Sequence, residues 1–445
     1  MSPITLGVLA VVWSVFILYT LSVLFWLYEV LILGRNQLVS SDELVYDHED
    51  VQVRILTIGA EAVVQATVNS IPDGIDDIRV ISEEDMQIDG ATVHVVPADF
   101  ECKARHKGRA LEWARRNVPC SREFILYLDE DTIVQKLRGL PDADVVQITE
   151  MPLYTGSWIA YLSETFRIGY QIEQRAFGQF KYPLYAWGGG IAIRKSVEDT
   201  ITWDAETITE DTNFIWRAAK AGDLDFRVLN LKFRNQAPPS LRGMFRQRRR
   251  WFAGTQHSSD VLPRRYRSLL GFRMVAWALS PLIPVMSVFL FLFPQYLPQP
   301  LLYQFGSLAM FLFLFVITLV GVRVYIRCER IQLLAVPLTP LLVVLNTAGA
   351  LWGWVSPVQT FAVTEKVAPK SEKVSPDVIE QKNPYLTEGD FEAHDGENRL
   401  IDNAGFVWVS FKDEWECSKK QFGYGRGWWI QISLGEGTYS QRWEQ

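Results

Sequence analysis

The stretch Tyr127-Leu-Asp-Glu-Asp-Thr132 ends a short apolar run, Phe124 to Leu128, and decides the fold that we predict for this chain. A short apolar run bounded by polar residues is typical of a buried strand. Asp129 and Asp131 stand one residue apart at the carboxyl end of that strand, where open α/β sheets bind ligands. A divalent cation held by one or two carboxylates can also bind phosphate groups. A solvated acidic turn is the plainer interpretation of a lone D-x-D.

Strand and helix patterns alternate on the amino-terminal side of this stretch. Predicted strands cover Val51 to Ile58, Ile78 to Ile81 and Thr92 to Val96, and predicted helices cover Ala60 to Ser70 and Gly108 to Arg116. This alternation indicates an α/β fold with a mostly parallel sheet and helices on both faces. Neither G-x-G-x-x-G nor G-x-x-x-x-G-K-[ST] follows these strands, so a dehydrogenase-type or P-loop nucleotide site is not expected.

Long apolar blocks predict a membrane protein. The first block, Ile4 to Leu33, contains a single acid, Glu29, and about 20 apolar residues suffice to cross the hydrocarbon. It lacks a basic start and a small-residue cleavage site, so we interpret it as an anchor and not as a signal peptide. Three later blocks are also long enough: Met274 to Pro294, Leu301 to Val322 and Ile331 to Val355. We therefore expect an integral, multi-pass membrane protein that contacts membrane lipids.

Positive charge predicts the orientation of these blocks. Arginines flank them at positions Arg35, Arg264, Arg265, Arg267, Arg273, Arg323, Arg327 and Arg330. Positively charged flanks face the cytoplasm, which places Gln37 to Arg273 there. If the last block crosses completely, everything after it lies outside the cytoplasm. That block also contains residues that permit a broken or re-entrant segment, so the alternatives stay open: Pro337, Pro340, Asn346, Gly349 and Gly353.

Composition narrows the classes of partner. The chain has 445 residues and a net charge of -7, which gives no reason to expect nucleic acid as a partner. Its four cysteines lack C-x-x-C spacing, so neither a zinc site nor a disulfide framework is indicated. We predict an anchor at 1–36, a cytoplasmic α/β domain at 50–268, a membrane region at 270–360, and a linker with a small β-rich module at 369–445. The module's strands are expected at Phe406 to Phe411 and Gly427 to Ile432, with its aromatic residues forming a core.

Two further polar strings follow the acidic one. Ile208-Thr-Glu-Asp-Thr212 opens a helical run, and Thr209 or Asp211 could simply cap that helix. Arg246-Gln-Arg-Arg-Arg-Trp251 lies on a predicted helix that leads to the membrane. The plainer interpretation of this second string is a basic amphipathic helix on lipid headgroups, with Trp251 as an interfacial anchor.

Taken together, the acidic strings fit one group-transfer site. We expect Asp129 and Asp131 to hold a divalent cation, Mg²⁺ or Mn²⁺, on the diphosphate of a nucleotide-diphosphate sugar. Asp211 would act as the general base that takes the proton of an acceptor hydroxyl, with Glu210 as a further catalytic or acceptor-binding group. One base and a metal-assisted leaving group imply a single displacement with inversion, which makes a β-glycoside from an α-linked donor.

The basic string completes this site. Gln247, Arg248 and Arg250 are expected to donate hydrogen bonds to the departing diphosphate, because guanidinium groups are planar and always charged. The indole of Trp251 would offer an apolar face to an acceptor sugar.

The strings D-x-D, T-E-D and Q-[QR]-x-R-W, in this order beside membrane spans, resemble the membrane-embedded family 2 glycosyltransferases, which include cellulose, chitin and hyaluronan synthases. The resemblance covers about residues 50 to 270 and implies the GT-A fold. It also implies that one acid after the second strand contacts the nucleotide base or ribose. Because Ser-Glu-Glu-Asp replaces the usual Asp-Asp-x-Ser there, Glu83, Glu84 and Asp85 all remain candidates.

A narrower resemblance is to the egghead-type β-1,4-mannosyltransferases. It rests on Val96 to Phe100, Lys107 to Leu111, Leu128 to Thr132, Glu164 to Arg167, Pro183 to Trp187 and Arg246 to Trp251. It implies GDP-mannose as the favoured donor, a lipid-linked acceptor, Lys107 in the donor site, and Trp187 with Glu210 in the acceptor site. In addition, Phe361 to Lys366 is similar to the F-x-V-T-x-K gating loop of cellulose synthases, which would place that segment in the cytoplasm.

The leading hypothesis is therefore an inverting membrane glycosyltransferase acting on a lipid-linked acceptor. The alternative within this class is a processive polysaccharide synthase that uses a UDP-sugar, extends a growing glycan and exports the polymer. Three to four apolar blocks favour single transfer, because a polymer channel needs more helices. The rival from another class is a non-catalytic binding protein, although Asp129, Asp131 and Asp211 are all present.

Overall fold

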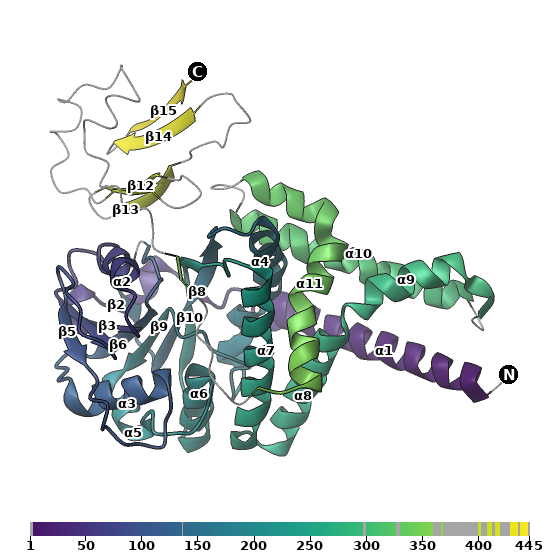
Figure 1. Ribbon diagram of the computed structural model, residues 1–445, viewed down its shortest axis with the longest axis horizontal. Coiled ribbons are helices and arrows are strands. Elements are labelled where there is room, and N and C mark those ends of the chain that lie inside the picture. Colours follow the sequence, from purple (N-terminus) through teal and green to yellow (C-terminus); the bar gives the residue numbers. More distant parts are fainter. Residues whose placement is uncertain are drawn as a thin grey trace.

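A computed structural model describes residues 3–358 apart from 136, 297–299 and 326–329, together with 366–367 and the strands between 399 and 443. The helices are α1 (Pro3–Tyr28), α2 (Glu61–Val68), α3 (Lys107–Asn117), α4 (Trp158–Gln171), α5 (Lys195–Ile201), α6 (Glu210–Ala221), α7 (Leu241–Ser258), α8 (Arg264–Leu279), α9 (Leu282–Leu292), α10 (Pro300–Tyr325) and α11 (Ala335–Val355). An α/β domain lies beside a group of long helices, and α1 projects away from the domain (Figure 1).

One eight-stranded sheet forms the centre of the domain, in the order β1-β10-β8-β9-β6-β3-β4-β5. Its strands are β1 (Leu38–Val39), β3 (Val51–Thr57), β4 (Asp77–Ser82), β5 (Thr92–Val95), β6 (Phe124–Asp129), β8 (Val145–Leu153), β9 (Ile191–Arg194) and β10 (Phe226–Gln236). All neighbouring pairs are parallel except the two that β9 makes with β6 and β8. The predicted α/β class with a mostly parallel sheet is confirmed.

The central strands are buried on both faces because helices and connecting segments cover each side. All seven residues of β3 are buried. Alternate β3 residues such as Val53 and Ile55 pack in one core with Leu126 and Leu128. Ile125 and Tyr127 of β6 pack in a second core with Phe214 of α6. Strands buried on both sides read as continuous apolar runs, as β6 does, whereas Gln52 and Arg54 interrupt the apolar run of β3.

The predicted elements before residue 130 agree with the structure to within one or two residues at most ends. The sequence did not reveal β8, β9, β10 or α4. Among these, β8 and α4 carry charged residues, the buried Glu150 and Glu164 and the half-buried Arg167, that interrupt the apolar patterns by which strands and helices are recognised.

Within the described residues, three helical segments are long and apolar enough to cross a membrane: Leu9–Leu33, Leu301–Val324 and Ile331–Val355. The predicted block Met274 to Pro294 is not one straight helix, because α8 and α9 are separate helices bent by 53°. The bend has a local cause. Pro284 has no N–H to donate to the carbonyl of Ser280, and Pro281 also lacks this donor. The pair is a broken span or a re-entrant loop.

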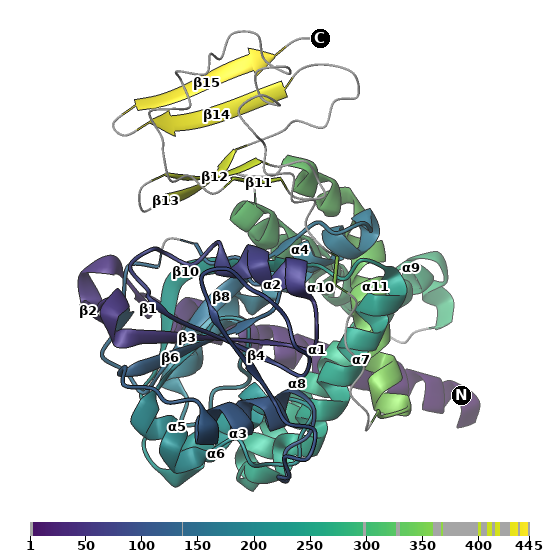
Figure 2. The same cartoon turned by 60° about the vertical axis from the view of Figure 1, so that its left-hand side comes forward.

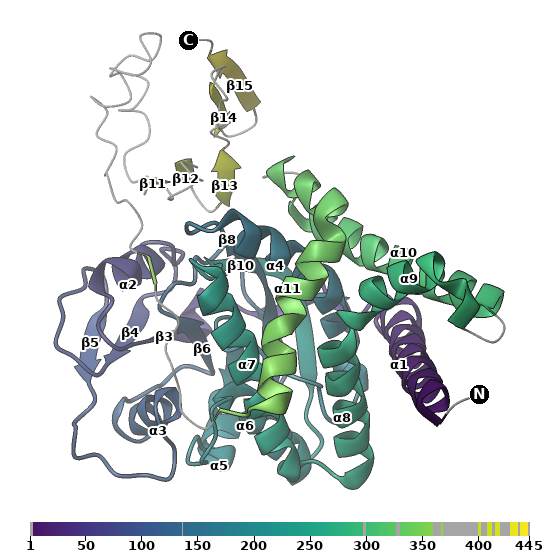
Figure 3. The ribbon, with the colours of Figure 1, turned by 45° about the vertical axis from the view of Figure 1, so that its right-hand side comes forward.

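The last apolar block forms one continuous helix, so the alternative of a broken segment is wrong for α11. It contains Pro340 and still runs unbroken from Ala335 to Val355. It packs along α7 at very short range (Figures 1 and 3). A Cβ atom on Gly349 would lie 2.5 Å from the carbonyl oxygen of Phe245, and one on Gly353 would lie 2.8 Å from that of Arg249. Only glycine allows this approach.

Smaller sheets complete the described part of the chain. β2 (Leu44–Tyr46) pairs with β7 (Leu140–Pro141). Near the carboxyl end, β11 (Arg399–Ile401), β12 (Val407–Phe411) and β13 (Glu414–Ser418) form an antiparallel sheet, and β14 (Trp428–Leu434) pairs with β15 (Gly437–Trp443), as Figure 2 shows. The predicted β-rich module is thus strand-forming, while the predicted linker from 369 to 398 lies outside the described residues.

A buried ion pair beneath the sheet provides a test of the fold. Arg54 is fully buried, lies 3.5 Å from Glu198, and donates to the hydroxyl of Tyr127 over 3.2 Å. We expect Arg54→Met to lower the free energy of unfolding by about 3–5 kcal/mol, because it leaves the Glu198 carboxylate buried without its cation. The unfolding midpoint of the detergent-purified protein measures this loss.

The matched control is Arg227→Met, which removes an arginine from an exposed pair with Asp225. Exposed pairs contribute roughly 0–1 kcal/mol, so its midpoint should hardly change. Equal shifts in the two variants would contradict the assignment of Arg54 as a buried structural cation.

Candidate active site

A cavity of about 580 Å³ lies at the carboxyl ends of β3 and β6 and collects residues from all three polar strings. Asp129 lines it from the first string, Glu210 and Asp211 from the second, and Gln247 with Arg250 from the third. These residues are far apart in the chain. Their meeting in one cavity shows that the strings belong to one site and are not independent turns, caps or surface charges.

Lys107 is the charged centre of this cavity. It opens α3, and its Nζ lies 2.5 Å from Asp129 Oδ1 and 3.5 Å from Glu210 Oε1. Burial works against the charge on each group, but the attraction prevails: the pKa of Lys107 is raised and that of Asp129 is lowered. Both groups therefore stay charged near neutral pH. The preceding residue, His106, has a φ of 53°, a strained conformation of the kind found at functional turns.

Asp211 has a different electrostatic environment. Burial, and next the neighbouring charge of Glu210, raise its pKa to about 7, against the opposing effect of Lys107. Its Oδ1 accepts a hydrogen bond of 2.7 Å from the backbone N–H of Thr212. Thr209 occupies the cap position of α6 but makes no capping hydrogen bond with its side chain. The cap interpretation is therefore not supported for Thr209, and a buried acid with a strongly raised pKa is a candidate functional group.

Close backbone approaches bring the strings together. A Cβ atom on Gly188 would lie 2.8 Å from Lys107 Nζ and 3.0 Å from Asp211 Oδ2. A Cβ atom on Gly189 would lie 3.0 Å from Asp129 Oδ2. The backbone after Trp187 therefore passes so close to the charged side chains that a larger residue than glycine would crowd them. Trp187 itself lines the cavity.

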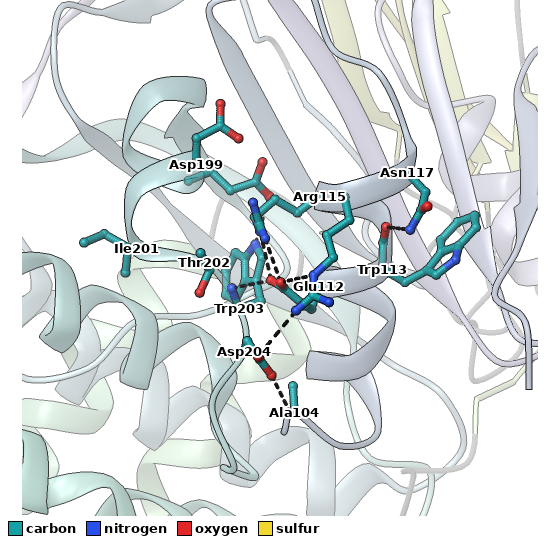
Figure 4. A network of polar contacts seen from close by, with 12 residues as sticks. Ala104, Glu112, Trp113, Arg115, Asn117, Asp199, Ile201, Thr202, Trp203 and Asp204 are labelled. Carbon is teal, nitrogen blue, oxygen red and sulfur yellow. Dashed lines mark hydrogen bonds and ion pairs between the residues drawn. The ribbon is translucent and has the colours of Figure 1, made fainter. Parts of the chain in front are cut away.

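A polar network next to the cavity joins the segment before α3 to the segment before α6 (Figure 4). Buried Glu112 accepts hydrogen bonds from the backbone N–H of Trp203, over 2.9 Å, and from the Arg115 guanidinium. Asp204 accepts from the backbone N–H groups of Lys103 and Ala104. These contacts tie Lys103, Ala104 and Glu112, which flank Lys107 in the sequence, to the segment at Trp203 and Asp204 that leads to α6. They therefore help to set the distance between the Lys107 and Asp211 side chains.

Asp131 lies just behind the cavity wall. Its Oδ2 accepts a 2.8 Å hydrogen bond from the backbone N–H of Gln236, and its Oδ1 lies 2.7 Å from Lys366 Nζ. Lys366 lines the cavity, and the neighbouring Val367 exchanges two hydrogen bonds with the Gln236 side chain. The end of the predicted gating-loop motif is therefore at the acidic string, while residues 361–365 of that motif lie outside the described part.

Some side chains of the basic string line the cavity, and one is buried in the protein interior. Gln247, Arg250 and Trp251 line the cavity. Arg248 does not: its side chain is fully buried and pairs with Glu164, and burial lowers its pKa to about 10. The prediction that Arg248 donates to the diphosphate is therefore wrong for this structure. Its guanidinium carbon instead lies 4.3 Å from the ring centre of Trp251, so it supports the indole from behind.

Of the three acids after the second strand, Glu83 lines the cavity and Glu84 and Asp85 do not. Glu83 lies 3.7 Å from Arg109 of α3. The structure thus favours Glu83 as the acid nearest a nucleotide. Glu84 instead lies beside Gly59, where a Cβ atom would meet its Oε2 at 2.6 Å.

Sequence reasoning missed several charged residues of the cavity. Glu130 lies between the two predicted acids and is hydrogen-bonded to Thr57 over 2.6 Å. Arg167 of α4 pairs with both Glu150 of β8 and Glu164. The sequence links Glu164 to Arg167 with the site only through the resemblance to the egghead-type enzymes. An acid and a base three residues apart on a predicted helix would have shown that they face one another.

Residues 124–345 match the family described as Glycosyl transferase family group 2, a range that contains all three strings. The chain carries a family 2 glycosyltransferase domain. This confirms the family predicted from D-x-D, T-E-D and Q-[QR]-x-R-W, and the mostly parallel sheet agrees with the GT-A-type fold that the family implies.

The glycosyltransferase domain has similar proteins among characterised sequences and solved structures. The chain is 26% identical to beta-1,4-mannosyltransferase egh of Drosophila melanogaster over 306 residues, which are 61% of this chain and 66% of that protein. The chain thus spans just under two thirds of that relative. Mannosyltransferase PcManGT of Pyrobaculum calidifontis, solved with GDP-Man and Mn²⁺, matches with 12% identity and a TM-score of 0.45 over 78% of this chain and 98% of its own. Glucosyl-3-phosphoglycerate synthase of Mycobacterium tuberculosis matches with 17% identity and a TM-score of 0.33 over 48% and 80%.

The raised pKa of Asp211 can be measured directly. We expect infrared difference spectra to show a protonated carboxyl band that disappears with a midpoint near pH 7 and is missing in Asp211→Asn. Glu210→Gln should lower that midpoint, because the charge of Glu210 raises the pKa of Asp211. Lys107→Ala should raise it, because a stabilising cation is lost. A midpoint that moves in the opposite direction in either variant would contradict the described geometry.

Proposed function

We propose that this protein moves a sugar from a nucleotide-diphosphate donor, with GDP-mannose favoured, onto a hydroxyl of a lipid-linked acceptor, with inversion at the anomeric carbon. The observation that supports this best is the pairing of two unlike acids in one cavity. Asp129 is held ionised by Lys107, while the pKa of Asp211 is close to 7. One acid is suited to binding charge and the other to moving a proton.

In this proposal Asp211 takes the proton of the acceptor hydroxyl as the hydroxyl oxygen attacks the anomeric carbon. The bond between that carbon and the donor diphosphate breaks, and the diphosphate leaves with the bonding electrons. Lys107 and Arg250 line the cavity beside the departing group and can donate to it. With a single base and no covalent sugar–protein intermediate, an α-linked donor yields a β-glycoside.

A divalent cation at this site would need ligands from the donor phosphates as well as from the protein. Asp129 and Asp131 offer carboxylate oxygens, but the described residues include no cluster of three or more His, Cys, Asp or Glu side chains placed to hold a metal. Lys107 and Lys366 also lie 2.5 Å and 2.7 Å from these carboxylates. In this proposal Asp129, which lines the cavity, would share an Mg²⁺ or Mn²⁺ ion with donor phosphate oxygens, and Asp131 would join it once its pair with Lys366 opens. The ion would neutralise the charge that develops on the diphosphate.

Single transfer is preferred to processive synthesis. The described residues supply three helices able to span a membrane, or four if the bent pair counts as one span. We propose that a set this small serves to anchor the domain and to present a lipid, whereas a synthase that exports polymer needs helices for a channel.

The deciding experiment is donor turnover by the complete protein in nanodiscs. It compares GDP-mannose, UDP-glucose, UDP-N-acetylglucosamine and UDP-glucuronate, with and without a divalent ion, and measures released nucleotide and glycolipid product. We expect metal-dependent transfer from GDP-mannose to a short glycolipid. Long polymer from a UDP-sugar would favour the synthase alternative, and binding without turnover would favour the non-catalytic rival.

Asp211→Asn tests the proposed base. General bases contribute roughly 10²- to 10⁴-fold, so we expect transfer to fall by that factor with the donor KM little changed. In the unchanged protein kcat should rise with pH and reach half its maximum near pH 7, because only ionised Asp211 accepts a proton. The control is Asp223→Asn, a fully exposed acid beyond the end of α6. Equal activity of the two variants would exclude Asp211 as the base.

We further propose that the protein is a multi-pass membrane protein with the glycosyltransferase domain in the cytoplasm, and that α11 does not cross the bilayer. Contacts at both ends of α11 support this. Just before α11, Gln332 accepts a hydrogen bond from the hydroxyl of Thr165 in α4. Just after α11, the backbone carbonyl of Ser356 accepts a 2.8 Å hydrogen bond from Arg249 of α7. Lys366 then reaches Asp131 in the domain.

Single cysteines in a cysteine-free background test this topology. Using a membrane-impermeant maleimide on oriented vesicles, we expect Val355→Cys at the end of α11 to be labelled from the same side as Lys220→Cys in the domain. Gln295→Cys, in the connection after α9, should be labelled from the opposite side. Labelling of Val355→Cys together with Gln295→Cys would show that α11 crosses the membrane.

A further inference from the structure

Thr209, the first residue of the T-E-D string, lies at the start of α6 and lines the cavity. The proposed reaction uses the next two residues, Glu210 and Asp211, and gives no part to Thr209. Its side chain is 9% exposed and makes no capping hydrogen bond to α6. The contacts that this side chain makes instead lead to α7.

The hydroxyl of Thr209 belongs to a buried cluster of three hydroxyl groups. Its Oγ1 lies 3.3 Å from the Oγ of Ser258, the last residue of α7, and 3.5 Å from Thr207 Oγ1. Thr207 Oγ1 in turn lies 2.8 Å from Ser258 Oγ and accepts a 3.1 Å hydrogen bond from the backbone N–H of Thr209. Each hydroxyl can both donate and accept, so the cluster joins the start of α6 to the end of α7.

The methyl group of Thr209 also packs against α7. A Cβ atom on Gly254 would lie 2.5 Å from Thr209 Cγ2 and 2.9 Å from Ile208 Cγ1, which is closer than such atoms can pack. The T-E-D string therefore crosses α7 at a point where only glycine leaves room for it. Both branches of the Thr209 side chain thus rest on the same helix.

The face of α7 that receives Thr209 is the face that carries the basic string. Residues three or four apart on a helix lie on one face, and such steps lead from Gln247 to Arg250 and Trp251, then to Gly254, and then to Ser258. The first three line the cavity. One side of α7 therefore holds the groups expected at the diphosphate and also fixes the first residue of the string that contains Asp211.

The charges of the two strings act on one another across this contact. Burial lowers the pKa of Arg250, while the charges of Glu210, Asp129 and Asp211 oppose that effect. Arg250 on α7 is thus within electrostatic reach of both acids of α6. Its distance from Asp211 depends on how the start of α6 lies on α7, and a displacement of about 1 Å in such a site can reduce the rate roughly 10²-fold.

We propose that Thr209 and Ser258 are positioning residues, which hold the start of α6 on the face of α7 that carries Gln247 and Arg250. Through this contact Asp211 keeps a fixed place relative to the group that leaves and to the hydroxyl that attacks. The inference rests on the proposed function, because it takes Asp211 as the base.

The test uses the complete protein in nanodiscs, with GDP-mannose as donor and a glycosyl lipid as acceptor. Thr209→Val keeps the shape of the side chain and removes the hydroxyl, so we expect kcat to fall roughly 2- to 10-fold, the usual effect of one lost hydrogen bond. The donor KM should stay the same, because Gln247 and Arg250 remain in place on α7. Ser258→Ala should reproduce this loss, and Thr209→Ser should restore most of the activity.

The matched control is Thr200→Val, which removes an exposed hydroxyl that donates a 2.8 Å hydrogen bond to the carbonyl of Ser196 in α5. It should leave kcat unchanged. The unfolding midpoint of each variant shows that it remains folded. A donor KM that rises while kcat is unchanged, or an equal loss in Thr209→Ser and Thr209→Val, would overturn the assigned role of the hydroxyl.

A second readout does not depend on turnover. Burial is the largest cause of the raised pKa of Asp211, and a loosened start of α6 would admit water. We expect the infrared midpoint of Asp211 to fall by roughly 0.4–1 pH unit in Thr209→Val, which corresponds to one hydrogen bond. An unchanged midpoint in both Thr209→Val and Ser258→Ala would overturn the proposal. If no donor is turned over, the proposed reaction fails, and the infrared midpoint still decides whether Thr209 positions Asp211.

Discussion

Lys107 donates to Asp129 over 2.5 Å and lies 3.5 Å from Glu210, so one ammonium group compensates carboxylates that come from β6 and α6. A charge taken out of water without a partner is strongly destabilising, and this requirement links elements that are distant in the chain. The first residue of α3, the end of β6 and the start of α6 must meet, and the Gly188–Gly189 backbone passes through the space between them. The pKa of Asp211, by contrast, is raised by burial and by the charge of Glu210, and only partly lowered by Lys107.

The same requirement connects the domain to the membrane helices. Arg248 of α7 pairs with Glu164 of α4, which also pairs with Arg167, and Arg167 reaches Glu150 of the sheet. α11 then lies on α7 at distances that only its glycines allow. These buried contacts fix the angle at which the domain meets the apolar helices. They also explain how one cavity can extend from the ends of the strands to the wall formed by α1 and α8.

An arginine in a characteristic string need not contact the ligand that the string suggests. Arg250 and Arg248 are two residues apart, yet one lines the cavity and the other is enclosed by Glu164 and Trp251. Residues two apart on a helix point in different directions, so one face of α7 serves the cavity and another serves the packing against α4. The buried arginine acts on the site indirectly, through the position of the indole.

The sequence by itself determined the class of fold, the first strands and helices, the membrane segments and the three strings of the site, because each leaves a local pattern: an apolar run, a period or a motif. It also grouped Asp129, Asp211, Gln247, Arg250 and Trp251, and all five line one cavity. The tertiary structure alone decided which acid after the second strand faces the cavity, where Arg248 points, that α8 and α9 are bent apart, and that Tyr19 belongs to the cavity. These features depend on contacts between residues far apart in the chain, and such contacts leave no mark on the order of neighbouring residues.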